Sequence, residues 1–71
     1  MKLENVKVGT KVRVKTKMNE DVLSFYIRHQ GSVGTVIEAP DVDGDVMVEF
    51  SDGAQDIGHH SNLKRIKEKH S

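Results

Sequence analysis

Basic side chains occupy every second position in the stretch KVRVKTK near the start of this chain. They are Lys11, Arg13, Lys15 and Lys17. Alternate positions of a strand point to the same face, so the four charges would form one row. Such a row can neutralise phosphates, and the resulting release of counterions supplies most non-specific affinity for nucleic acid. The same row could instead only solvate a strand and guard its edge against aggregation.

A second basic group lies near the end of the sequence, at Lys64, Arg65 and Lys67. The net charge is zero, yet residues 1–17 hold six basic and one acidic group, and residues 18–57 hold one basic and nine acidic groups. If the first and last strands are neighbours, the two basic groups form one pole. The opposite pole is a predicted acidic rim of Asp41, Asp43, Asp45, Asp52 and Asp56.

The segment MNEDVLSFYIRHQ, residues 18–30, contains the densest apolar group of the chain, namely Leu23, Phe25, Tyr26 and Ile27. Its apolar residues fit both strand alternation and helical spacing, and Asn19 could cap a helix. We predict an extended arm, because a short isolated helix would be marginal in an otherwise all-strand chain. One loop cannot easily hide four large side chains, and an exposed apolar patch marks an interface. These residues therefore predict a protein-binding surface.

Other chemistry is poorly supported. Asp41, Asp43 and Asp45 could attract a cation, but Val46 stands where an EF-hand loop needs glycine. His59 and His60 would point to opposite sides of an extended segment, so they should not share a metal ion. No serine lies in a nucleophile motif, and no glycine loop is suited to phosphate. We expect no enzyme activity, cofactor or metal site.

Aromatic residues are scarce, with one Tyr, two Phe and no Trp. Polyproline grooves and methyl-lysine cages need several rings, and so do platforms on which single-stranded nucleic acid stacks. Phe50 is expected in the core, which leaves Tyr26 and His29 as the exposed candidates for stacking on bases. Specialised aromatic recognition is therefore disfavoured.

The elements that position these residues are predicted to be short strands. Residues 11–17 alternate as a first strand, and further strands are expected around Val33 to Ile37, Val46 to Phe50, Ala54 to Ile57, and Leu63 to Ile66. Asp43-Gly44 and Asp52-Gly53 predict hairpin turns in which both residues have positive φ. The residues from Gly58 to Asn62 predict a tight turn. Leu3, Val6 and Val8 predict an extended N-terminal segment that packs across the core.

Length and composition indicate a single small domain. With 71 residues, 35% of them hydrophobic and 31% charged, the chain has room for one core. We predict a domain over residues 1–66 and a flexible tail over 67–71. There is no cysteine, no apolar run long enough to span a bilayer and no signal-peptide pattern. A cytoplasmic monomer is the expectation.

The spacing of glycine and β-branched residues resembles that of an SH3-like barrel. The pattern comprises Gly9-x-x-Val12-x-Val14, Gly31-x-x-Gly34-x-Val36, Val46-x-Val48-x-Phe50-x-x-Gly53 and Leu63-x-x-Ile66. It is similar to KOW-type and MIB/HERC2-type barrels, although residues 18–30 are longer than the KOW pattern and the cysteine and tryptophan positions of the other type are missing. The layout also resembles the small phage and prophage proteins of the YorP type.

The sequence therefore predicts an all-β, five-stranded, SH3-like barrel that serves as a non-enzymatic binding or adaptor module. The first hypothesis is a protein interface at Leu23, Phe25, Tyr26 and Ile27. The alternative is nucleic-acid binding through Lys11, Arg13, Lys15, Lys17, Lys64, Arg65 and Lys67.

Overall fold

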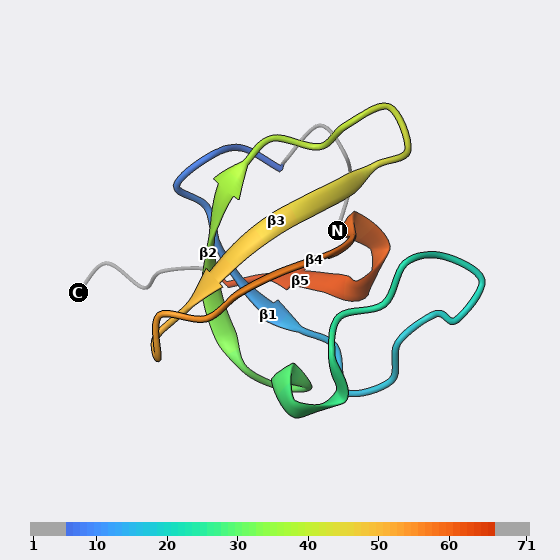
Figure 1. The fold of residues 1–71 in the computed structure, drawn as a ribbon, viewed down its shortest axis with the longest axis horizontal. Helices are drawn as coiled ribbons and strands as arrows, with labels where there is room; N and C mark the ends of the chain where they lie inside the picture. The colour runs from blue at the N-terminus through green and yellow to red at the C-terminus, as the bar shows by residue number, and fades with distance from the viewer. Residues whose placement is uncertain (1–5, 67–71) are drawn as a thin grey trace.

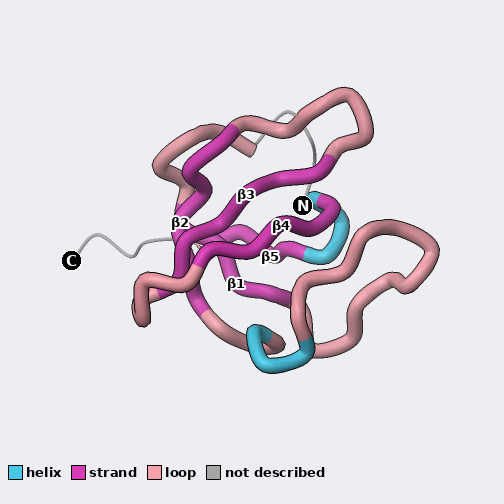
Figure 2. The backbone as a smooth tube through the Cα atoms, in the orientation of Figure 1, coloured by secondary structure: helices cyan, strands magenta, loops and turns pink. Residues whose placement is uncertain are grey.

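The computed structural model describes residues 6–66, which form one antiparallel sheet (Figure 1). Its strands are β1 (Lys11–Val14), β2 (Val33–Glu38), β3 (Asp45–Phe50), β4 (Gln55–His59) and β5 (Leu63–Arg65). Two 3₁₀ turns, η2 (Ile27–His29) and η3 (His60–Asn62), are the only helical elements of the described residues (Figure 2). The prediction of an all-β, five-stranded fold is confirmed. The predicted tail, 67–71, lies outside the described residues.

The strands are ordered β4-β3-β2-β1-β5, and every neighbouring pair is antiparallel. The first and last strands are therefore neighbours, as predicted, with Arg13 opposite Lys64 and Val14 opposite Leu63. Strands β4 and β5 do not pair with each other, so they form the two edges of an open sheet within residues 6–66. Closure into a barrel stays a prediction.

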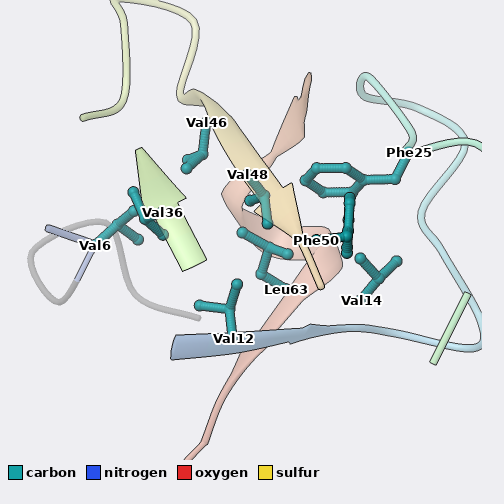
Figure 3. Packing of buried hydrophobic residues seen from close by; sticks show 9 residues of the cluster. All are labelled: Val6, Val12, Val14, Phe25, Val36, Val46, Val48, Phe50 and Leu63. Atoms are coloured by element: carbon teal, nitrogen blue, oxygen red, sulfur yellow. The ribbon is translucent and has the colours of Figure 1, made fainter. Parts of the chain in front are cut away.

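The core lies on one face of the strands and is built mainly from valine (Figure 3). Strict alternation turns every second side chain of β1 and β3 inward, so the residues between the buried ones face outward. The buried apolar residues are Val6, Val12, Val14, Phe25, Val36, Val46, Val48, Phe50 and Leu63. The prediction for Val8 is wrong, because this side chain is 63% exposed.

Gly34 brings β2 close to β3. A Cβ atom at this position would lie 2.5 Å from Val48 Cγ1 and 2.8 Å from the carbonyl oxygen of Glu49. A side chain would therefore force the two strands apart. Further along, the register shifts between Val36 and Glu38, which marks a β-bulge.

The two predicted Asp-Gly turns lie where expected, but their type differs. Positive φ occurs only at the glycines, with 82° at Gly44 and 85° at Gly53, and no other residue type within the described chain has positive φ. The backbone N–H of Gly44 donates to Asp41 O and that of Gly53 to Phe50 O. Each turn is thus a three-residue loop that ends in a left-handed glycine, which relieves the aspartates of an unfavourable backbone conformation.

Candidate functional site

The long connection between β1 and β2, residues 15–32, is the most elaborate surface element, and we call it the docking loop. It extends away from the sheet (Figure 1) and has no regular structure apart from η2 at its end. The predicted extended arm, residues 18–30, is thus found in part: residues 18–26 form no helix, whereas Ile27–His29 form η2. A loop of this length needs tertiary contacts to hold one conformation.

Phe25 forms the deepest of these contacts, and its predicted role in an exposed interface is wrong. It is 2% exposed and points from the docking loop into the core beside Phe50 (Figure 3). A Cβ atom on Gly58 would lie 2.5 Å from Cε2 of Phe25, so the ring occupies the space that the glycine leaves open. Phe25 anchors the docking loop and is not available to a partner.

Asn62 fixes the middle of the docking loop from the far end of the chain. Its side chain is fully buried. The backbone N–H of Asn19 donates to Oδ1 of Asn62 at 2.6 Å, and Nδ2 donates to the carbonyl oxygens of Asn19 and Leu23 at 3.3 and 3.1 Å. The carbonyl of Leu23 also accepts from the backbone N–H of His59 at 2.8 Å. A buried amide with these partners is satisfied and ties the loop to η3 and β4.

A buried pair of His29 and Asp56 fixes the end of the docking loop. The predictions that His29 is exposed and that Asp56 belongs to an acidic rim are both wrong, because they are 3% and 8% exposed. Nδ1 of His29 donates to Oδ2 of Asp56 at 2.9 Å, and the same oxygen accepts from the backbone N–H of Tyr26 at 2.7 Å. The His29 ring stacks on Phe50, with centroids 4.1 Å apart. Burial on the inward side of β4 explains why Asp56 differs from the exposed aspartates.

The base of the docking loop is closed by the backbone and by Arg13. The N–H of Gly31 donates to Val14 O at 2.8 Å, and the N–H of Val14 donates to Ser32 O at 3.0 Å. Nη1 of Arg13 donates to Gly31 O at 2.8 Å while the side chain stays exposed. The guanidinium is thereby held where the loop leaves the sheet.

Held at these points, the docking loop presents an apolar surface to solvent. Ile27 is 79% exposed, Tyr26 65% and Leu23 44%. Cζ of Arg28 lies 5.8 Å from the centroid of the Tyr26 ring, within the range of a cation–π contact. Three of the four predicted interface residues are therefore exposed, and Ile27 and Tyr26 are the largest apolar side chains that the loop leaves uncovered.

Basic side chains gather beside the base of the docking loop. The set Arg13, Lys15, Lys17 and Lys64, which we call the basic strip, lines one shallow hollow together with Val14 and Thr16. Arg13 and Lys64 are directly opposite across β1 and β5, so they share a face. Within residues 6–66 none of these four side chains is in an ion pair. The structure thus brings these four predicted residues together, and their use as a nucleic-acid face stays a prediction.

The remaining members of the predicted basic face are placed differently. Arg65 is opposite Val12, whose side chain is buried, so the register assigns Arg65 to the other face of the strands. Lys11 shares the outward face of Arg13 at the far end of β1, and Lys67 lies outside the described residues. Of the described members, only Arg65 is thus assigned to the other face.

The other candidate ligands belong to turns. Oxygens of Asp41, Asp43 and Asp45 lie within 4.8 Å of one another, and this is the one group of potential metal ligands in the described chain. Oδ1 of Asp41 already accepts from the backbone N–H groups of Asp43 and Asp45, at 2.9 and 3.0 Å, which is the normal role of aspartate in a turn.

His59 and His60 do not point apart, contrary to the prediction. Their ring centroids are 4.3 Å apart, because η3 begins at His60 and turns the chain at that point. Nδ1 of His59 accepts from the backbone N–H of Ser61 at 3.1 Å. His59 caps the turn that delivers Asn62 to the docking loop.

Within residues 6–66 there is no helix of the length and apolar character needed to cross a membrane. Comparison with known proteins found no matching family model, no matching curated protein and no matching solved structure.

Proposed function

We propose that this chain is a small non-enzymatic binding module that recognises a protein partner through Leu23, Tyr26 and Ile27 of the docking loop. The observation that carries the proposal is the contrast within one short segment. Phe25 is buried, whereas Tyr26 and Ile27 beside it are largely exposed. Apolar side chains held out by an ordered backbone lose little conformational entropy on binding, which favours recognition.

The proposed architecture is an SH3-like barrel. The order of elements supports it, because a long loop follows β1, two tight turns join β2 to β3 and β3 to β4, and a 3₁₀ turn precedes β5. Membership of the KOW, MIB/HERC2 or YorP groups, a cytoplasmic location and a monomeric state stay predictions.

Site-specific photo-crosslinking tests the proposed interface in cells that produce the protein. A photoreactive amino acid is placed at position 27 or, as a matched control, at position 42, because Val42 is fully exposed on another loop. We expect a protein to be crosslinked from position 27 and not from 42. The purified partner should then bind the unmodified chain, with an affinity about tenfold lower for Ile27→Ser. Equal crosslinking from both positions would overturn the proposal.

A second candidate function is nucleic-acid binding by the basic strip. The register that places Arg13 beside Lys64 favours it, since adjacent cations can bridge neighbouring phosphates. A labelled duplex and a labelled single strand should be titrated at about 50 and 200 mM salt, where each phosphate contact lowers affinity by about 0.9 log units per log of salt. The double variant Arg13→Glu/Lys15→Glu should abolish binding. Absence of binding at low salt would eliminate this candidate.

A further inference from the structure

The basic strip and the exposed part of the docking loop form one continuous surface. A second hollow lies along the docking loop and is lined by residues that include Lys17, Met18, Ser24 and Ile27. This hollow shares Thr16 and Lys17 with the hollow of the basic strip. A ligand that covers Ile27 can therefore continue past Lys17 toward Lys15 and Lys64 without leaving the surface.

Charge along this surface is strongly one-sided. The hollow of the basic strip is lined by Arg13, Lys15, Lys17 and Lys64 and by no acidic residue. The hollow of the docking loop has one acidic lining residue, Glu20, and one basic lining residue, Lys17. The excess of positive charge therefore lies in the hollow of the basic strip. The bond from Arg13 to Gly31 O fixes one of these cations in place. Arg28 lines a further hollow with Tyr26 and Ile27, so a cation also stands beside the exposed apolar residues. A complementary ligand must therefore carry an apolar group with negative charge next to it.

The exposed apolar residues of the docking loop distinguish between two anionic ligands, a nucleic acid and an acidic peptide. A single-stranded nucleic acid would stack successive bases on several rings. Tyr26 is the one exposed phenylalanine or tyrosine ring in the described chain, because Phe25 and Phe50 are buried. Ile27 beside it is aliphatic and 79% exposed, which suits a leucine-like or similar side chain. The surface therefore favours a peptide over a nucleic acid.

We propose that the partner presents an extended peptide segment in which acidic side chains flank an apolar anchor. The anchor packs on Ile27 and Tyr26, and the acidic side chains lie over Lys17, Lys15 and Lys64. This inference rests on the proposed function, because it names the partner chemistry of the same docking loop. In this proposal, the apolar residues of the docking loop and the basic strip are parts of one binding site.

Fluorescence anisotropy with synthetic peptides tests the proposal on the full chain. The probe is a labelled peptide with a central leucine flanked by glutamates. One control peptide carries glutamine in place of glutamate, and another carries glycine in place of leucine. A labelled oligothymidylate of similar length is included as the nucleic-acid arm.

Two charge-reversal variants of equal net charge make the comparison specific. Lys17→Glu changes the shared part of the two hollows, whereas Lys7→Glu changes an exposed lysine that lines neither of them. We expect Lys17→Glu to weaken binding of the acidic peptide about tenfold and Lys7→Glu to change it less than about twofold. Ile27→Ala should weaken binding of the leucine peptides about fivefold to tenfold. Both lysines are exposed, so the variants should fold, as far-ultraviolet circular dichroism would verify.

The outcomes separate this inference from the proposed function. If the glutamine peptide binds as well as the acidic one and Ile27→Ala weakens both, the docking loop stands as an interface and the acidic specificity is overturned. If Lys17→Glu matters while Ile27→Ala and the glycine peptide change nothing, the apolar interface itself is wrong. Tighter binding of oligothymidylate than of the acidic peptide, with the same response to Lys17→Glu, would assign the surface to nucleic acid and overturn the peptide proposal.

Discussion

Two loops of this protein connect neighbouring strands and are held by opposite means. The docking loop, residues 15–32, is ordered by Phe25, Asn62 and the pair of His29 and Asp56. The loop between β2 and β3 is ordered by Asp41, whose carboxylate accepts from two backbone N–H groups within the same turn. The side-chain bonds of the first loop reach residues 27 to 43 positions away, as in those from His29 to Asp56 and from Asn19 to Asn62. The second loop is held mainly by its nearest neighbours, with one distant bond from the backbone N–H of His60 to Gly44 O.

This difference teaches where a small protein can place a binding surface. In a turn closed mainly by its own residues, the side chain at the tip packs on nothing, and Val42 is fully exposed. The docking loop can present Tyr26 and Ile27 in a fixed orientation because the side chain of the preceding residue, Phe25, is buried in the core. Preorganisation of this kind reduces the entropic cost of binding.

The largest expected effect comes from removing the anchor of the docking loop. Phe25→Ala should lower the free energy of unfolding by about 3 to 5 kcal/mol, since it deletes a buried ring from the core. Val42→Ala in the other loop should change it by less than about 0.5 kcal/mol, because the side chain is exposed. Chemical denaturation followed by circular dichroism measures both. Similar small losses for the two variants would remove the distinction between the loops.

Asn62→Ala should have the next largest effect. It leaves the backbone groups of Asn19 and Leu23 without the buried amide, at a cost of about 2 to 3 kcal/mol. Urea denaturation gives the stability, and hydrogen exchange should show faster exchange at Asn19 and little change at Asp43. A variant with wild-type stability and unchanged exchange would show that the docking loop does not depend on Asn62.

Asp56→Asn should be milder, about 1 to 2 kcal/mol, because an amide oxygen in the place of Oδ2 can still accept from Tyr26 and His29. The amide NH2 group then replaces Oδ1 and cannot accept the bond from the backbone N–H of Ile57. NMR chemical shifts of Tyr26 and His29 should change together, and those of the turn at residues 41–45 should not. Asp43→Asn is the control, since that aspartate is exposed. Equal effects of the two substitutions would contradict the buried role of Asp56.

Asp41→Ala should have the smallest effect, about 1 kcal/mol or less, because it removes bonds to Asp43 and Asp45 that are exposed to water. Amide shifts should change only within residues 41–45. Changes that spread to the docking loop would show that the two loops are coupled.

The sequence predicts the parts of the fold that are encoded locally. Alternation of Val46, Val48 and Phe50 places β3, and the Asp-Gly pairs place the two tight turns within one or two residues. The turn type was wrong because a glycine in the left-handed region needs no partner with positive φ, and aspartate avoids that strain.

The candidate site could be predicted only in part, because the burial of its residues depends on partners far away in the sequence. Phe25 is buried only because Gly58 leaves space for its ring, and His29 is buried only because Asp56 lies on the inward side of β4. In β4 the apolar Ile57 stands between Asp56 and Gly58, and this pattern predicts that Ile57 faces inward and Asp56 outward. The structure has the opposite arrangement, so the pattern offered no sign that Asp56 is buried. The basic strip was easier, because Lys15 and Lys17 continue a strictly alternating pattern and adjacency of the terminal strands was correctly expected.

Amide hydrogen exchange measured by NMR tests the central claim, that the docking loop is held in one conformation by distant contacts. The N–H groups of Asn19 and Tyr26 donate to the side chains of Asn62 and Asp56. We predict that they exchange at least about tenfold more slowly than the N–H of Val42, whose side chain is fully exposed at the other loop. Exchange of Asn19 and Tyr26 as fast as that of Val42 would show that the docking loop is open in solution, and the account of a preformed binding surface would be wrong.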